Sequence, residues 1–101
     1  MTQVIHVVLV RWRGDADAGA REAVRAGVRG LRRAIPGVLA IEEGTSVSPE
    51  GLEQGNEYGF VVTFQDAAAR DAYLPHPAHL VVAEAIGRAT ERVTVFDVAA
   101  G

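Results

Sequence analysis

Nearly every position from Val4 to Trp12 (VIHVVLVRW) is hydrophobic, and many of these residues are β-branched. The segment is too short, and too apolar on both sides, for an amphipathic surface helix, so we predict a strand. Alternating side chains place two sets on opposite faces: Val4, His6, Val8, Val10 and Trp12 on one, and Ile5, Val7, Leu9 and Arg11 on the other. Both faces therefore need burial, and His6 lies in an otherwise apolar row.

Apolar residues then recur at helical spacing (Ala20, Val24, Val28, Leu31), which predicts a long helix capped by Asp15 or Asp17 and ended after Ile35 by Pro36-Gly37. Close packing on a sheet is the expected compensation for Gly27 and Gly30 inside this helix. Four arginines form an i, i+4 row, namely Arg21, Arg25, Arg29 and Arg33. We interpret the row as a solvated helix face in preference to a site for an acidic partner.

The remaining chain predicts a strand over 38–47, a polar loop over 48–55 and a strand over 57–64. A short helix capped by Asp66 runs to about Tyr73, a further helix follows Pro77 to about Gly87, and the last strand covers 93–98. The order β-α-β-β-α-β, with its second helical region broken in two, predicts an α+β, ferredoxin-like fold. Its four-stranded antiparallel sheet carries the helices on one face.

The other sheet face is expected to need a partner. A lone antiparallel sheet normally carries polar residues on its solvated face, yet the first and third strands are apolar on both sides. We therefore predict a symmetric homodimer in which two sheets pack face to face around a barrel-like core.

The amino-acid composition excludes several classes of function. The 101 residues predict a single domain over 1–101, with 49% hydrophobic and 23% charged residues, a balance typical of globular proteins. A net charge of −3 without a basic cluster argues against nucleic acid binding. Cysteine and lysine are both absent, which excludes disulfides, thiolate metal sites and Schiff-base lysine chemistry. The N-terminal apolar run Val7–Val10 is too short for a membrane span or signal peptide, so a cytoplasmic location is expected.

The segment Tyr73-Leu74-Pro75-His76-Pro77-Ala78-His79 concentrates the candidate chemistry. Its prolines fix their own φ and disfavour the α conformation at Leu74 and His76, which predicts a stiff corner between two helices. Pro77 suits the first helical position, so His79 is expected in the first turn with its ring near unpaired backbone N–H groups.

These residue types best permit proton abstraction next to a carbonyl group. The positive end of a helix disfavours the imidazolium of His79, which leaves a neutral ring as the base, and Tyr73 would donate its O–H to the developing enolate. His6, Tyr58 and His76 are the candidate substrate-binding residues for a small hydrophobic ligand.

Two alternatives stay open. In a purely structural one, His76 caps the last helix, His79 bonds to backbone and Tyr73 is a core aromatic with a satisfied hydroxyl. In a metal-binding one, His6, His76 and His79 act as ligands with Glu57 or Asp97. It is disfavoured because His76 precedes Pro77 and should point away from the cap.

Four features together resemble the stress-responsive A/B barrel (Dabb) family: Ile5-His6-Val7-Val8-Leu9, Ile35-Pro36-Gly37-Val38, Glu43-Gly44 and Tyr73…His76-Pro77-Ala78-His79. The resemblance implies dimeric barrels of ferredoxin-like subunits. The family includes olivetolic acid cyclase, a plant polyketide cyclase, and the resemblance implies Tyr73 and His79 as the acid–base pair of a cofactor-free ring closure. It also includes plant stress proteins, which keeps a noncatalytic structural or ligand-binding role as the alternative.

Overall fold

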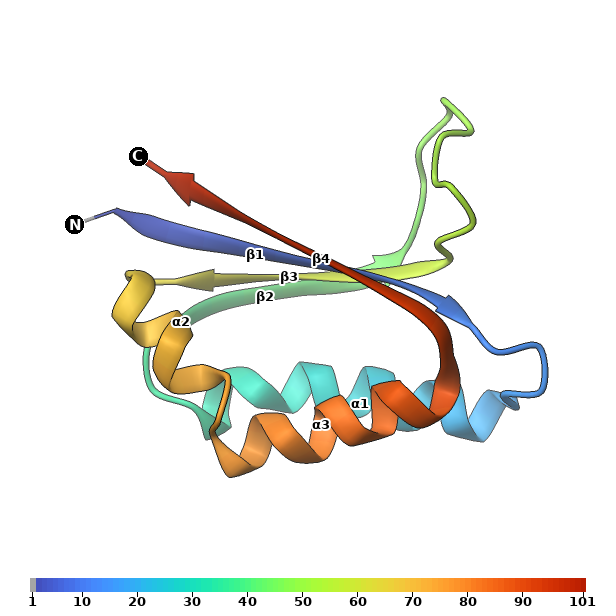
Figure 1. Ribbon diagram of the computed structural model, residues 1–101, viewed down its shortest axis with the longest axis horizontal. Coiled ribbons are helices and arrows are strands. Elements are labelled where there is room, and N and C mark those ends of the chain that lie inside the picture. The colour runs from blue at the N-terminus through green and yellow to red at the C-terminus, as the bar shows by residue number, and fades with distance from the viewer. Residues whose placement is uncertain (1) are drawn as a thin grey trace.

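Four strands and three helices follow one another in the order β-α-β-β-α-α-β in the computed structural model, which describes residues 2–101 (Figure 1). The elements are β1 (Gln3–Trp12), α1 (Ala18–Ala34), β2 (Val38–Thr45), β3 (Tyr58–Phe64), α2 (Ala67–Tyr73), α3 (Pro77–Ala89) and β4 (Thr90–Ala100). The ferredoxin-like fold is thereby confirmed, with the second helical region divided into α2 and α3 at the prolines.

The strands form one antiparallel sheet in the order β2-β3-β1-β4, and all three helices cover one of its faces (Figure 1). The register places His6 between Val62 of β3 and Asp97 of β4. Residues 91 positions apart in the chain therefore share one face of neighbouring strands, which assembles the site described below.

The core lies between the sheet and the helices. It takes alternate residues of β1 and β3, as the apolar rows predict, together with Val24, Val28 and Leu31 of α1. The prediction that the sheet accommodates Gly27 and Gly30 is wrong. A Cβ at Gly27 would lie 3.1 Å from Val82 Cγ2 on α3, whereas one at Gly30 would meet nothing within 4 Å among residues 2–101.

Several boundaries differ from the prediction. Strand β2 ends at Thr45, and β4 begins at Thr90, directly after α3, because pairing with the full length of β1 extends it beyond 93–98. Leu74 keeps the α conformation (φ −57°, ψ −44°) despite Pro75, since its N–H still bonds to the Arg70 carbonyl; His76 is extended as expected. No helix among residues 2–101 is long and apolar enough to cross a membrane.

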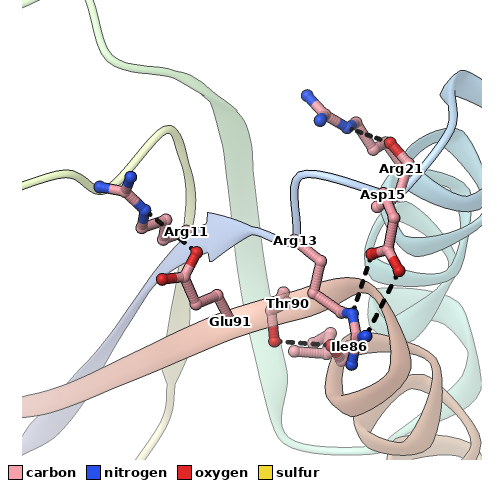
Figure 2. A network of polar contacts seen from close by, with 8 residues as sticks. Arg11, Arg13, Asp15, Arg21, Ile86, Thr90 and Glu91 are labelled. Atoms are coloured by element: carbon pink, nitrogen blue, oxygen red, sulfur yellow. Dashed lines mark hydrogen bonds and ion pairs between the residues drawn. The ribbon is translucent and has the colours of Figure 1, made fainter.

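The junction between α3 and β4 is held by polar contacts near the end of β1 (Figure 2). Thr90 Oγ1 donates to the Ile86 carbonyl at 2.7 Å, and Arg11 Nε lies 3.3 Å from Glu91 Oε2. Arg11 pairs with Arg92 and Trp12 with Thr90, so Glu91 is an extra residue that bulges β4. The junction fixes the start of β4 against the end of α3, and the two elements diverge from there.

The sheet face opposite the helices, here called the open face, is uncovered and mostly apolar. It carries Ile5, Val7, Leu9, Val61, Phe96 and Val98, with the charged residues Arg11, Glu42 and Arg92 nearer its margins. The loop over residues 46–57 rises on this side of the sheet, away from the helices (Figure 1). The central strands are apolar on both faces, but the chain itself covers only the face that packs against the helices.

Candidate functional site

The proline corner joins α2 to α3 over one end of the sheet. His76 is the N-cap of α3, and its Nδ1 accepts a hydrogen bond from the Ala78 N–H at 3.1 Å. Pro77 occupies the first turn, where its missing N–H costs nothing. His76 is thus engaged with the backbone, and the structure does not bring it to the pocket described below.

Tyr73 brings the other members of the corner together. Its side chain is fully buried, and its ring centroid lies 4.3 Å from that of His79, 4.9 Å from that of Phe64 and 5.9 Å from that of His6. Three of the residues singled out from the sequence, His6, Tyr73 and His79, therefore form one cluster.

His79 is oriented by a backbone carbonyl. Its Nδ1 lies 2.9 Å from the Leu74 carbonyl oxygen, which is only an acceptor, so Nδ1 carries a proton, and it is Nε2 that holds the lone pair in the neutral ring. The expectation that the ring would lie near unpaired N–H groups of α3 is wrong, because the carbonyl that ends α2 takes that position. The bond nevertheless leaves Nε2 as a free proton acceptor.

His6 is oriented in the same way by a carboxylate. Its Nδ1 lies 2.6 Å from Asp97 Oδ1, and Asp97 Oδ2 accepts from Arg70 Nη1 at 2.7 Å. Burial alone would raise the pKa of Asp97, but the hydrogen bonds from His6 and Arg70 outweigh burial and hold it below its ordinary value. The buried His6 thus also retains Nε2 for another contact.

Sequence reasoning missed Arg70 and considered Asp97 only as a metal ligand. The signal for Asp97 was available, since antiparallel pairing of the first and last strands sets it opposite His6. Arg70 reaches Asp97 from α2, a contact that depends on how the short helix packs and carries no sequence pattern.

The Tyr73 hydroxyl is buried without a hydrogen-bond partner in the part of the chain that the structure describes. Burial raises the pKa of Tyr73 above its usual value, so the group stays a phenol and acts as a proton donor. A buried donor without an acceptor is costly, and an incoming oxygen atom would relieve that cost.

A pocket of about 260 Å³ lies between α3 and the sheet, beside the two imidazoles. Its walls come from the sheet, the corner and α3, namely His6, Val8, Phe60, Leu74, His79, Ala83, Ile86, Gly87, Val93 and Val95. Tyr73 is not among the lining residues, so its hydroxyl lies behind the wall that His79 forms. The corner is therefore not sealed at His79, whereas Tyr73 itself is packed.

Tyr58 lies elsewhere. It is opposite Val10, four residues along β1 from His6, a separation of roughly 14 Å. Its ring stacks on Trp12 at 5.3 Å, Arg25 lies over it at 5.7 Å, and burial, followed by Glu43, raises its pKa. The structure thus does not bring this predicted substrate-binding residue to the pocket, which β3 lines with Phe60, two residues further along the strand.

A metal centre finds no geometric support in residues 2–101, where no group of three or more His, Cys, Asp or Glu side chains is placed to hold an ion. His6 and His79 both direct Nδ1 to oxygen acceptors, and His76 directs its own to the backbone of α3. The arrangement is one of oriented imidazoles around an apolar pocket.

Comparison with known structures identifies the same architecture. The Arabidopsis thaliana protein At3g17210 is 30% identical with a TM-score of 0.88, and the match covers 97% of this chain and 95% of that one. A dimeric ferredoxin-like protein of unknown function from Jannaschia sp. CCS1 is 26% identical with a TM-score of 0.86, over 95% of this chain and 97% of that one.

A third similar structure is the hydroxynitrile lyase from Passiflora edulis, with a TM-score of 0.89 over 98% of this chain and 94% of that one. Its 21% identity shows a shared fold alone. No curated protein matches the chain. The family model described as the stress responsive A/B barrel domain matches residues 4–100, and the chain accordingly belongs to the stress-responsive A/B barrel (Dabb) family.

Proposed function

We propose that the protein binds a small hydrophobic carbonyl compound in the pocket between α3 and the sheet and converts it by acid–base chemistry, as a cofactor-independent cyclase or isomerase. The observation that carries the proposal is the pairing of His6 and His79. Both line one apolar pocket, and both have Nδ1 engaged with an oxygen acceptor, which reserves Nε2 for a ligand.

In this scheme His79 Nε2 removes a proton from the carbon next to a carbonyl group, and the C–H electron pair moves to form an enolate. Tyr73 lies behind His79 and outside the pocket lining, so its hydroxyl, which has no partner among residues 2–101, would reach the enolate oxygen only when the wall that His79 forms moves aside. For ring closure the enolate carbon attacks a second carbonyl of the same molecule, and the new alkoxide takes the proton back from His79. His6 positions the substrate through Nε2.

The volume of the pocket limits the size of the substrate. Its 260 Å³ is below the range of about 300–1,000 Å³ that drug-sized ligands occupy, so a compact compound fits best. A longer chain would extend past Val93 and Val95, which are exposed on the edge strand. Since a protein of the same fold is a hydroxynitrile lyase, hydroxynitriles form a second substrate class for a screen.

The same proposal includes a homodimer built through the open face. Similar structures are described as dimeric, and the open face carries Phe96 and Val98 exposed to solvent. A second copy supplies the apolar cover that the chain itself lacks.

A noncatalytic ligand-binding or stress-responsive role is the second candidate. It is favoured by the backbone bonds of His76 and His79 and by the complete burial of Tyr73, which a structural corner would also show.

Turnover of a panel of poly-β-ketones and hydroxynitriles tests the choice. We expect His79→Ala to abolish turnover, Tyr73→Phe to lower it about tenfold or more, and both variants to remain folded by circular dichroism. His76→Ala is the matched control, because it alters only the cap of α3 and should retain turnover. Equal rates in wild type, His79→Ala and Tyr73→Phe would reject the catalytic role.

A further inference from the structure

The open face is not flat, because two glycines face each other across β2 and β3. Gly44 pairs with Gly59, and above them lies a hollow of about 350 Å³, which we call the glycine hollow. Leu9 and Val61 line it from the sheet, and the loop over 46–57 contributes Ser46, Glu53, Asn56 and Glu57 as a wall.

The space over Gly44 is not filled by the chain's own side chains. A Cβ at Gly59 would lie 2.9 Å from Leu9 Cδ2, so the Leu9 side chain already occupies the space above that residue. A Cβ at Gly44 would meet nothing within 4 Å in the described part of the chain. The open face therefore has an apolar depression that its own side chains leave unfilled.

The same face carries a matching projection. Phe96 is 67% exposed, the largest side chain among the exposed hydrophobic residues, and it lies on the edge strand β4 at the opposite side of the sheet from β2. An aromatic side chain buries about 150–250 Å² when it is covered, so leaving this one in water is costly. Projection and depression lie on one surface of one chain, so they can meet only between two copies.

Sheet geometry permits the meeting. Phe96, Val7, Val61 and Glu42 form one row across the open face, and Thr94, Leu9, Gly59 and Gly44 form the next, about 7 Å along the strands. When two sheets face each other across a two-fold axis parallel to the strands, β4 of one copy lies over β2 of the other. Phe96 then lies over the partner's Glu42, and its ring enters the partner's hollow by leaning one row along the strands, while the two sheets lie about 10 Å apart.

We propose that Phe96 of each copy inserts into the glycine hollow of a second copy, so that two symmetric insertions set the register of the dimer. The inference rests on the proposed dimer through the open face and adds its interlocking residues. The loop over 46–57 supports it, because this loop rises on the open side of the sheet and contains two largely exposed apolar residues, Val47 and Leu52.

Sedimentation equilibrium on four variants tests the interlock. Phe96→Ala removes the projection, and Gly44→Val fills the hollow without an intrachain clash, at a residue whose φ is not positive. Each is expected to raise the dimer dissociation constant by about tenfold or more, as interface hot spots do. Leu80→Ala, an exposed apolar residue on α3, is the matched control and should leave the constant unchanged.

The double variant Phe96→Ala/Gly44→Val supplies the direct evidence for contact. In this variant the added isopropyl group faces the space that the phenyl ring left. The rise in its dissociation constant should therefore be smaller than the product of the fold-changes in the two single variants. If the wild type is a dimer and both single variants have the same dissociation constant as the wild type, the interlock is wrong. The proposal of a dimer through the open face would then still stand. A monomeric wild type would overturn both, whereas turnover in the pocket is measured separately and does not bear on either result.

Discussion

Tyr73 places a hydroxyl group inside the core with no acceptor among residues 2–101. A buried polar group left without a partner costs about 1–3 kcal/mol, so the ring serves packing while the hydroxyl opposes folding. The hydroxyl therefore lowers the stability of the free protein. That loss is easier to understand if a ligand oxygen accepts a hydrogen bond from the hydroxyl than if the residue serves structure alone.

Tyr73→Phe is therefore expected to keep or increase the stability of the free protein, by up to about 2 kcal/mol, because it removes the unpaired hydroxyl and keeps the ring contacts. Urea denaturation measures the change, and turnover on the same sample should fall. A loss of stability above about 1 kcal/mol would show instead that the hydroxyl has a structural partner.

Asp97 has a pKa below its ordinary value in the folded protein, since the hydrogen bonds from His6 and Arg70 outweigh burial. Its ionised form therefore stabilises the fold above the unfolded pKa of about 4, and this contribution is lost as the pH falls through the lower folded value. Asp97→Asn should cost about 2 kcal/mol at pH 7, and the difference from wild type should shrink toward pH 3.

Asp71→Asn is the control for that measurement. Asp71 also pairs with Arg70, at 2.8 Å, but its side chain is 68% exposed, so its removal should cost no more than about 0.5 kcal/mol at any pH. Equal effects of the two substitutions would contradict a special role for the His6–Asp97–Arg70 chain.

The helix α1 offers a matched pair of glycines. Gly30 has open space around an added Cβ in the described structure, so Gly30→Ala should stabilise the protein by about 1 kcal/mol through helix propensity. Gly27→Ala gains the same propensity but presses on Val82 at 3.1 Å, so its net effect should be smaller or destabilising. Thermal unfolding of both variants checks the order, and an equal gain would mean that α1 and α3 are not closely packed at Gly27.

Most elements followed from local pattern because each has its own periodicity and its own end signal. The alternating rows of β1 and β3, the Asp66 cap of α2 and the break at Pro36-Gly37 required no tertiary information. The start of β4 required tertiary information, because pairing with β1 extends the strand back to Thr90.

The candidate site was predictable only in part. The motif placed Tyr73 and His79 together, but Tyr58 and Phe64 are equivalent in the sequence pattern of β3 and lie at opposite ends of the strand, so only tertiary structure shows which one adjoins the corner. The Leu74 carbonyl bound by His79 and the contact of Arg70 with Asp97 likewise depend on how α2 packs.

The sheet separates two surfaces of the molecule. The pocket with His6 and His79 lies on the helix side, and the apolar open face lies on the other, although both are built from alternate residues of β1 and β4. The strands thus give one face to ligand chemistry and the other to assembly, and a substitution on one face should leave the other function intact.

Val7→Glu places a charge in the middle of the open face and should make the protein monomeric, while turnover per chain stays within about threefold of wild type, since no lining residue of the pocket changes. Ala83→Leu should do the reverse, filling the pocket and abolishing turnover in an intact dimer. Val81→Glu, on the exposed surface of α3, is the control for added charge and should change neither property. Sedimentation and turnover on the three variants decide the matter: loss of turnover in monomeric Val7→Glu would mean that the second copy completes the site.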